Sequence, residues 1–298
     1  MRSKEANPIR IIAGPCSINP ENIEQLYKIA GITYLTDSKP KGGIAGLRVV
    51  GLKSRSTFQS ESSHIGIDWE VCLQNLSKLK NGNIEELEIP PSVKIAQEVV
   101  EQTGLLVATE IMMPHIQIPP FQNKIPEQKL LLWNPSVNQL GWHTLQIAQY
   151  AQANNWFVGL KNPKWSEGAE KVWQGLNSYS HYFAPQTILI HRGFSCPEKK
   201  QWRSCPNHDL AAKVKKTTSL PLFFDPSHSF GSKLRDQIVP GTIEAMKKRI
   251  GENFLYDGIL IEAGTSTTDS NQHITISELK QLVQQLASFR QISNSFYE

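Results

Sequence analysis

Short runs of apolar residues recur along the chain, and each is followed by a polar or glycine-containing turn and then by a helical pattern. The runs lie at 11–17, 46–53, 105–111, 129–134, 156–162, 187–193, 220–228 and 257–263. They are rich in β-branched side chains and are apolar throughout, which is typical of parallel strands buried on both faces. The sequence therefore predicts eight parallel strands.

Helical periodicity fills the intervals between these runs. Asn19 and Pro20 predict an N-cap followed by an N1 proline at the first helix. Ser277 or Thr275 with Glu278 predicts a capping box at the last helix. The predicted helices cover 21–31, 65–80 together with 92–103, 143–154, 167–178, 207–216, 231–250 and 275–290.

Alternation of eight strands with helices in 298 residues predicts an α/β fold, a single (β/α)8 barrel. One domain is expected over 1–298, with its core at about 10–290. The segment 112–128 holds four prolines, so the third crossover is expected to be irregular. The segment 37–46 predicts a loop rather than a linker between domains, and the tail 293–298 is expected to fray.

The composition is that of an ordinary folded chain. Hydrophobic residues make up 39% and charged residues 19%, which excludes a disordered, collagen-like or coiled-coil protein. No apolar run reaches the ~18 residues of a membrane helix. The N-terminus is polar and has no signal-peptide core, so we expect a cytoplasmic protein without a membrane partner. The net charge of +4 comes from scattered residues, which argues against a nucleic-acid partner.

The four cysteines, Cys16, Cys72, Cys196 and Cys205, form no CxxC motif. Cysteines of a cytoplasmic chain stay reduced, so no disulfide is expected. Cys72 lies in a helical pattern and is expected to be a small buried apolar residue.

Polar residues end nearly every predicted strand. The active site of such a barrel is built at the carboxyl ends of its strands, so these residues are expected to converge. One set holds a thiol, an imidazole and two carboxylates, which are ligand types for a divalent transition metal such as Mn, Fe, Co or Zn. The alternative is a buried cysteine, a capped histidine and ordinary surface acids. This set comprises Cys16, His228, Glu262 and Asp269.

A second set at the same strand ends is cationic. Converging Arg and Lys side chains suit phosphates and carboxylates, and Arg can bind them through two parallel hydrogen bonds. The alternative is that these cations pair with nearby acids. The set comprises Arg48, Lys53, Arg55, Lys161 and Arg192.

Six motifs at successive strand ends carry a family resemblance. They are AGPCS (13–17), RVVGLKSRS (48–56), GLKNP (159–163), IHRGFS (190–195), DPSHSFG (225–231) and YDGILIE (256–262). In this order they resemble the 3-deoxy-7-phosphoheptulonate (DAHP) synthase family, in its short bacterial type without a regulatory or chorismate mutase domain. The stretch WRSCPN (202–207) is similar to a further motif of that type. The resemblance covers nearly the whole chain.

The resemblance implies a transferase of the first step of the shikimate pathway, which leads to the aromatic amino acids. Phosphoenolpyruvate would condense with erythrose 4-phosphate in a metal-dependent, aldol-type reaction that gives 3-deoxy-7-phosphoheptulonate and phosphate. The partners implied are small phosphorylated substrates and other copies of this chain, in a dimer or tetramer.

The resemblance also implies roles for individual residues. Lys53 would donate a proton and Asp269 would complete the metal shell, so these two are the predicted catalytic residues. Arg55 and Ser56 would face the phosphate of erythrose 4-phosphate. The metal ligands would be Cys16, His228, Glu262 and Asp269. The phosphoenolpyruvate cations would be Arg48, Lys53, Lys161 and Arg192.

Three departures from the family pattern keep alternatives open. Asn134, Pro135 and Ser136 stand where the family has a Gly-Ala-Arg triplet, so one substrate arginine is missing. KSRS replaces the family motif KPRT, and no histidine closely follows Glu262. One alternative is a related synthase that uses another aldose. The other is a catalytically silent paralogue used for binding.

Overall fold

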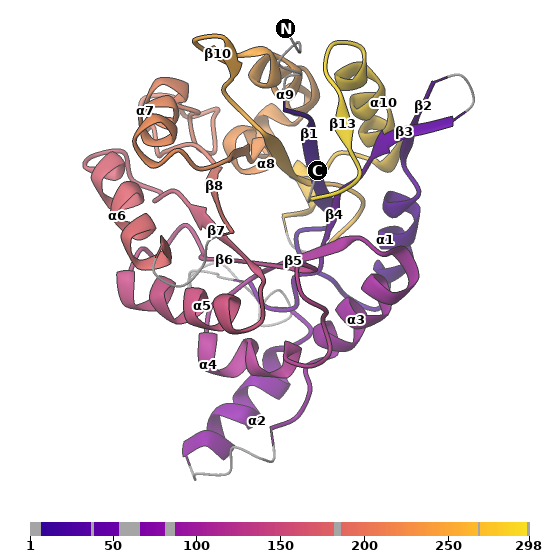
Figure 1. Ribbon diagram of the computed structural model, residues 1–298, viewed down its shortest axis with the longest axis vertical. Helices are drawn as coiled ribbons and strands as arrows, with labels where there is room; N and C mark the ends of the chain where they lie inside the picture. The colour runs from indigo at the N-terminus through magenta and orange to yellow at the C-terminus, as the bar shows by residue number, and fades with distance from the viewer. Residues whose placement is uncertain are drawn as a thin grey trace, which may run out of the picture.

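The structure is a computed structural model that describes residues 7–36, 39–53, 66–80, 87–181, 186–267 and 269–296. Eight of its strands close into a parallel barrel, which confirms the predicted fold (Figure 1). The barrel strands are β1 (Ile9–Gly14), β4 (Gly46–Arg48), β5 (Leu106–Glu110), β6 (Leu130–Trp133), β7 (Phe157–Lys161), β8 (Thr187–His191), β9 (Leu222–Phe224) and β12 (Gly258–Glu262). The first barrel strand, β1, pairs with the eighth, β12, and this pairing completes the ring. Its register runs from Arg10 opposite Gly258 to Gly14 opposite Glu262.

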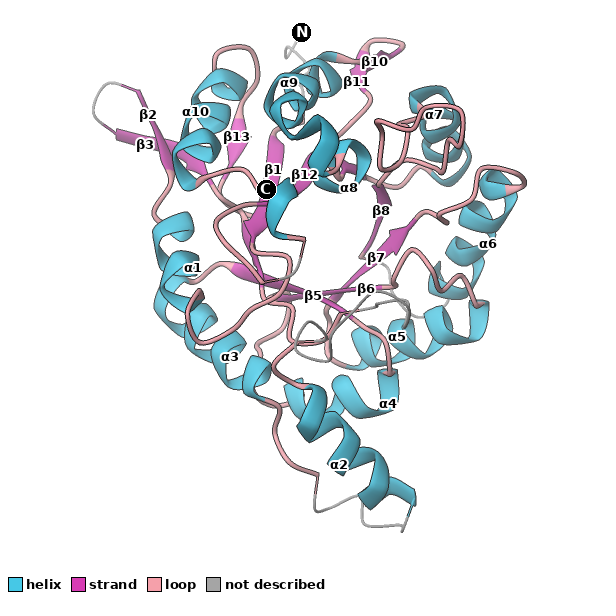
Figure 2. Cartoon of the chain, turned by 180° about the vertical axis from the view of Figure 1, so that it is seen from behind, coloured by secondary structure: helices cyan, strands magenta, loops and turns pink. Residues whose placement is uncertain are grey.

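The helices lie outside this ring, and α2 projects farthest from it (Figure 2). The third crossover is irregular, as predicted, because its prolines leave only α4 and the 3-10 turn η3. None of the described helices is long and apolar enough to cross a membrane. The helices are α1 (Ile23–Ala30), α2 (Trp69–Lys80), α3 (Pro91–Thr103), α4 (Pro114–Gln117), η3 (Pro119–Phe121), α5 (Gly141–Ala153), α6 (Ala169–His181), α7 (His208–Thr218), α8 (Pro226–Phe230), η4 (Ser232–Gln237), α9 (Ile238–Lys247), η5 (Ser270–Gln272) and α10 (Ile276–Ala287).

Successive strand residues point alternately outward to the helices and inward to the barrel axis. In β7, Val158 and Leu160 belong to the large outer cluster, whereas Phe157 belongs to the smaller inner one. Gly159 points inward as well, where a Cβ atom would come within 2.9 Å of Trp133. By the same alternation Lys161 faces the barrel interior.

Two predicted helix starts have different outcomes. Helix α1 has its N-cap at Asn22 rather than Asn19, so the prediction of an N1 proline at Pro20 is wrong. The Asn19 side chain instead accepts hydrogen bonds from the backbone N–H groups of Glu21 and Asn22 and forms the preceding turn. The predicted capping box of α10 is confirmed, with Thr275 as the N-cap.

Three predicted segments, a loop, a strand and a helix, have different boundaries in the structure. The segment 37–46, predicted as a loop, contains β3 (Lys39–Gly43), which pairs with β2 (Thr33–Thr36) in an antiparallel hairpin. The predicted strand 220–228 ends at Phe224, because Asp225 caps α8 through the backbone N–H of His228. The predicted helix 231–250 divides into η4 and α9, and a hairpin of β10 (Arg249–Ile250) and β11 (Asn253–Phe254) follows.

The C-terminal tail does not fray over its described part. Strand β13 (Ile292–Ser293) pairs with the beginning of β1. The Phe296 ring lies 5.0 Å from the Phe157 ring and 5.7 Å from the Phe223 ring, and belongs to the cluster inside the barrel. The tail therefore helps to close the end of the barrel opposite the strand ends that hold the predicted site.

Candidate functional site

Inward-facing polar residues form a layer at the carboxyl ends of the barrel strands. Arg48, Glu110, Lys161 and Glu262 end their strands and are at most 2% exposed. Trp133 lies among them, with its ring centroid 5.6 Å from the Arg48 guanidinium carbon and 5.9 Å from Lys161 Nζ. The Trp133 Nε1 donates a hydrogen bond of 3.3 Å to Glu110. The last inward-facing residue of each of these strands is therefore charged, whereas the inward-facing residues before it are apolar.

Three of the predicted cations pair with buried acids. The alternative that these cations are neutralised by acids is therefore correct for part of the set. Each pair is almost completely removed from water, so the loss of one partner would leave an uncompensated charge. The pairs are Arg48 with Glu262 (3.1 Å), Lys53 with Glu110 (3.3 Å) and Lys161 with Asp225 (2.8 Å).

Arg192 differs from these three. It is 5% exposed, and its Nε and Nη1 atoms have no hydrogen-bond partner among the residues that the structure describes. Burial, and then the neighbouring charge of Arg203, lower the pKa of Arg192 to about 10. Arg48 Nη1 is likewise buried without a described partner. Buried guanidinium groups with unsatisfied donors favour an anionic ligand.

Two asparagines position the cations on neighbouring strands. Asn134 accepts a hydrogen bond of 2.8 Å from the Lys161 N–H and donates one of 3.2 Å to the Lys161 carbonyl. Asn162 accepts from the Arg192 N–H at 2.6 Å and donates to the Gly193 carbonyl at 2.8 Å. Each asparagine therefore fixes the backbone that carries the next cation. In the sequence, Asn134 belongs to an altered motif and Asn162 to the motif GLKNP, but neither was assigned a role.

Three of the four predicted metal ligands come together. One ligand atom from each of Cys16, Glu262 and Asp269 lies within 4.8 Å of the other two. The Cys16 Sγ is 3.6 Å from Asp269 Oδ2. His228 is outside this group, although its Nε2 lies 3.6 Å from Glu262 Oε1. We call these four residues the ligand cluster.

The ligand cluster fits a divalent metal ion. Asp225 accepts from His228 Nδ1 at 3.0 Å, so Nε2 is oriented toward Glu262, as in histidines that bind metals. Burial lowers the pKa of His228 to about 4, which keeps the imidazole neutral. Burial, followed by Glu262, raises the pKa of the Cys16 thiol well above its usual range. A cation would relieve this crowding, and a sulfur, nitrogen and oxygen donor set suits Mn, Fe, Co or Zn.

Sequence reasoning missed three residues beside the ligand cluster. Arg203 lies 3.1 Å from Asp269 Oδ2, and the Gln272 side-chain amide donates to Glu262. The Cys16 N–H donates to His273 Nε2 at 2.9 Å. Similarity of the 202–207 stretch to a family motif was the only sequence signal, and it concerned Arg203 alone.

Two predicted substrate residues, Arg55 and Ser56, lie outside the described residues. Lys53 is the last residue of the described segment 39–53, and its side chain forms an ion pair with Glu110. The predicted role of Arg55 and Ser56 toward the acceptor phosphate stays a prediction.

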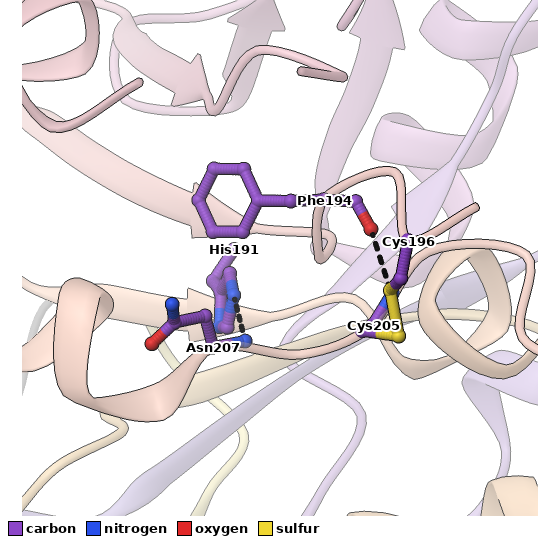
Figure 3. The surroundings of a disulfide bond; sticks show 5 residues. All are labelled: His191, Phe194, Cys196, Cys205 and Asn207. Carbon is purple, nitrogen blue, oxygen red and sulfur yellow. Dashed lines mark hydrogen bonds between the residues drawn. A yellow bond between two sulfur atoms is a disulfide. The ribbon is translucent and has the colours of Figure 1, made fainter. Parts of the chain in front are cut away.

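A disulfide joins Cys196 to Cys205, so the prediction that all cysteines are reduced is wrong for this pair (Figure 3). Phe194 and Cys205 form an antiparallel bridge with hydrogen bonds of 2.9 and 2.7 Å, which brings the two cysteine Cα atoms to 6.0 Å. The cross-link closes the loop between β8 and α7. This loop begins at Arg192 and presents Arg203 to Asp269. Cys16 and Cys72 are free and buried.

Comparison with known proteins adds evidence at the level of structure. No family model matches the sequence, and no curated protein matches it. A crystal structure of phospho-2-dehydro-3-deoxyheptonate aldolase (DAHP synthase) from Thermotoga maritima superposes with a TM-score of 0.70 over 95% of this chain and 69% of that chain, at 20% identity. The chain has the fold of the DAHP synthases.

A second solved structure supports this assignment. A truncated 3-deoxy-D-arabino-heptulosonate 7-phosphate synthase from Thermotoga maritima gives a TM-score of 0.64 at 18% identity, and the match covers 95% of this chain and 87% of that chain. Both DAHP synthases match nearly the whole described barrel. At 18–20% identity, the likeness shows the fold.

Proposed function

We propose that this chain is a divergent DAHP synthase. It would be a transferase that condenses phosphoenolpyruvate with erythrose 4-phosphate to give 3-deoxy-7-phosphoheptulonate and phosphate, at the head of the shikimate pathway. The observation that carries the proposal is the unpaired, buried guanidinium of Arg192 in the same layer as a sulfur and carboxylate cluster. An anionic substrate and a metal ion would satisfy both features.

Phosphoenolpyruvate fits the cationic layer. Its phosphate and carboxylate would contact Arg192, Lys161, Arg48 and Lys53. Of these, Arg48 and Lys161 lie beside the Trp133 ring at the carboxyl ends of the strands. Three of these cations are held in place by acids, so the site is organised before substrate binds. Organised donors lower the barrier because they need not reorient during the reaction.

The reaction then proceeds by carbon–carbon bond formation. Carbon 3 of phosphoenolpyruvate attacks the aldehyde carbon, and the aldehyde oxygen takes a proton from Lys53. Water adds to the positively charged carbon 2 and gives up one proton, which restores the Lys53 ammonium. The carbon–oxygen bond to phosphate then breaks, the new hydroxyl gives its proton to the departing phosphate, and carbon 2 becomes the ketone carbonyl of the product. The Glu110 carboxylate, 3.3 Å from Lys53 Nζ, orients this proton donor.

A divalent metal held by Cys16, His228, Glu262 and Asp269 would supply Lewis acidity toward the aldehyde oxygen. The chain's own contribution is to hold these donors at one place. Gln272 and Arg48 both contact the Glu262 carboxylate, and Arg203 contacts Asp269. Such contacts orient ligands and raise metal affinity.

The decisive experiment measures phosphate release from phosphoenolpyruvate by the purified protein loaded with Mn, Fe, Co or Zn. Each reaction contains one aldose phosphate from a panel, and the seven-carbon product is identified by mass. Release that depends on erythrose 4-phosphate and is lost in Lys161→Met supports the proposal. Equal release without an aldose, or none with any aldose, refutes it.

Two other functions compete. The Asn134-Pro135-Ser136 triplet and the KSRS motif favour a related synthase that uses another aldose, and the panel detects it as turnover with that sugar only. A silent paralogue would bind phosphoenolpyruvate without turnover. Assembly into a dimer or tetramer is also proposed, and light scattering after gel filtration measures it.

A further inference from the structure

His273 joins two loops that each carry a residue of the ligand cluster. Its Nε2 accepts a hydrogen bond of 2.9 Å from the Cys16 N–H, and its Nδ1 lies 3.0 Å from the Asp269 carbonyl oxygen. A carbonyl only accepts, so both hydrogen bonds form together when Nδ1 carries the proton and Nε2 does not. The two loops follow β1 and β12, the strands whose pairing closes the barrel. One neutral imidazole therefore links the two sides of this seam.

The backbone of His273 is itself held on two sides. The next residue, Ile274, forms a parallel bridge with Ala263 and donates to the Glu262 carbonyl at 3.1 Å. The His273 carbonyl accepts a hydrogen bond of 3.2 Å from Arg235 Nε. His273 is also buried, with 5% of its surface exposed. A buried ring on an anchored backbone has little freedom to turn, so it can fix the position of the groups that it contacts.

The backbone conformation of Asp269 requires such support. Its φ angle is 52°, in the left-handed region that residues other than glycine rarely adopt. Its carbonyl accepts from the Gln272 N–H at 3.1 Å and from His273 Nδ1. Unfavourable backbone conformations persist where surrounding contacts over-determine them, and they cluster at functional sites. The hydrogen bond from His273 thus helps to keep the Asp269 carboxylate 3.6 Å from the Cys16 sulfur.

We propose that His273 is a positioning residue of the ligand cluster, which sets the spacing between the Cys16 sulfur and the Asp269 carboxylate for a divalent transition metal. The inference rests on the proposed function, because it takes the ligand cluster as a metal site. A thiolate and a carboxylate repel each other when both are ionised, so the two loops need a link that does not depend on the ion.

The link to Cys16 should also affect which metal is preferred. Thiolate ligands favour zinc, whereas carboxylate ligands suit manganese. Loss of His273 leaves the Cys16 backbone N–H without its acceptor and the thiolate less well placed. Zinc binding should therefore weaken more than manganese binding.

Three variants remove the two hydrogen bonds separately. His273→Ala loses both. His273→Asn retains an amide N–H near the place of Nδ1 for the Asp269 carbonyl, and His273→Gln retains an amide oxygen near the place of Nε2 for the Cys16 N–H. His143→Ala is the matched control, because His143 is also buried, lies on α5 outside the barrel, and its Nε2 contacts the Met112 carbonyl at 3.3 Å.

Titrations of the full-length, metal-free protein with zinc and with manganese give the dissociation constants. The Kd for zinc should rise roughly ten- to a hundredfold in His273→Ala, as it does when residues that orient metal ligands are removed. Titration with cobalt reports the sulfur ligand through the near-ultraviolet absorption of the cobalt–thiolate bond. This absorption should weaken in His273→Ala and His273→Asn and persist in His273→Gln. His143→Ala should keep the wild-type affinity and spectrum.

Melting temperatures measured in chelator show whether each variant is folded. Unchanged zinc affinity in folded His273→Ala overturns the inference, and so does an equal loss in His143→Ala, which would reflect only the removal of a buried ring. If His273→Ala does not fold, the Asn and Gln variants decide, because equal cobalt–thiolate absorption in the two overturns the inference and the expected difference supports it.

The same titrations separate the inference from the proposed reaction. A wild type that binds metal in the expected dependence on His273, but does not convert phosphoenolpyruvate, supports the inference and refutes the reaction. A wild type that turns over and binds zinc no more tightly than folded His273→Ala supports the reaction and overturns the inference. A wild type that binds no metal overturns both.

Discussion

Replacing Arg192 by Met should make the protein more stable and at the same time impair it. The guanidinium is 5% exposed and forms no ion pair within the described residues, and burial lowers its pKa to about 10, well below the usual value of this group. This difference corresponds to about 3 kcal/mol by which the folded state disfavours the charge at neutral pH. Met fills a similar volume without a charge, so the melting temperature should rise by up to about 5 °C for a chain of this length.

If the proposed function is correct, the same substitution removes a charge-assisted contact to phosphoenolpyruvate. We expect phosphoenolpyruvate binding or turnover to fall roughly ten- to a hundredfold. Differential scanning fluorimetry and calorimetric titration with phosphoenolpyruvate measure the two effects on the same sample. A gain in stability together with a loss of binding is the signature of a group kept for its ligand.

Arg290→Met is the control for this reasoning. Arg290 is also 5% exposed, and burial lowers its pKa to about 10. Its Nε and Nη1 donate to the Asn7 and Tyr256 carbonyls at 2.7 Å, at the opposite end of the barrel. Because Arg290→Met leaves these two carbonyls without their donors, it should gain less stability than Arg192→Met or lose stability, and it should keep phosphoenolpyruvate binding. If Arg192→Met instead melts lower and binds phosphoenolpyruvate normally, the cationic layer is structural and our reasoning is wrong.

Further predictions concern the ligand cluster and the loops. Cys16→Ala and His228→Ala should each lose most of about one bound transition metal per chain, and full occupancy by elemental analysis in both would remove the assignment. Ser136→Arg should lower the KM for phosphoenolpyruvate by restoring a cation, whereas a loss of turnover would indicate a remodelled pocket. Cys196→Ser should lower the free energy of unfolding by at most about 3 kcal/mol, measured in denaturant without reductant, because the closed ring is short. Burial holds the pKa of His208 at about 4 against 6.5, so thermal stability should fall as pH drops from about 6.5 to 4, and less so in His208→Gln.

The eight barrel strands were predictable because their signal is local. Strands buried on both faces must be apolar throughout, and runs such as 129–134 and 187–193 stand out for that reason. The site residues at strand ends followed from the same pattern, because parallel strands bring their carboxyl ends together. Cys16 and Glu262 were therefore predicted together although 246 positions separate them.

The features that the sequence did not reveal depend on contacts between distant segments. Phe296 is ordered because the barrel interior receives its ring, and no local pattern in the tail indicates this. The cross-link at Cys196 depends on a bridge between Phe194 and Cys205, which a spacing of nine residues does not predict. Gln272 and His273 lie between β12 and α10, where the path of the chain is fixed by the elements around it. No hydrophobic periodicity in this segment of the sequence therefore indicates that they contact Glu262 and Cys16.

The bond between Cys196 and Cys205 makes the choice of reductant part of every measurement on this protein. A dithiol such as dithiothreitol can open this ring and can also compete for any thiophilic ion that the proposed ligand cluster binds. A phosphine reductant opens the ring and offers no thiolate. Parallel activity assays in the two reductants therefore distinguish the effect of opening the ring from the effect of removing a bound ion. Preparations made in one reductant are not comparable with preparations made in the other.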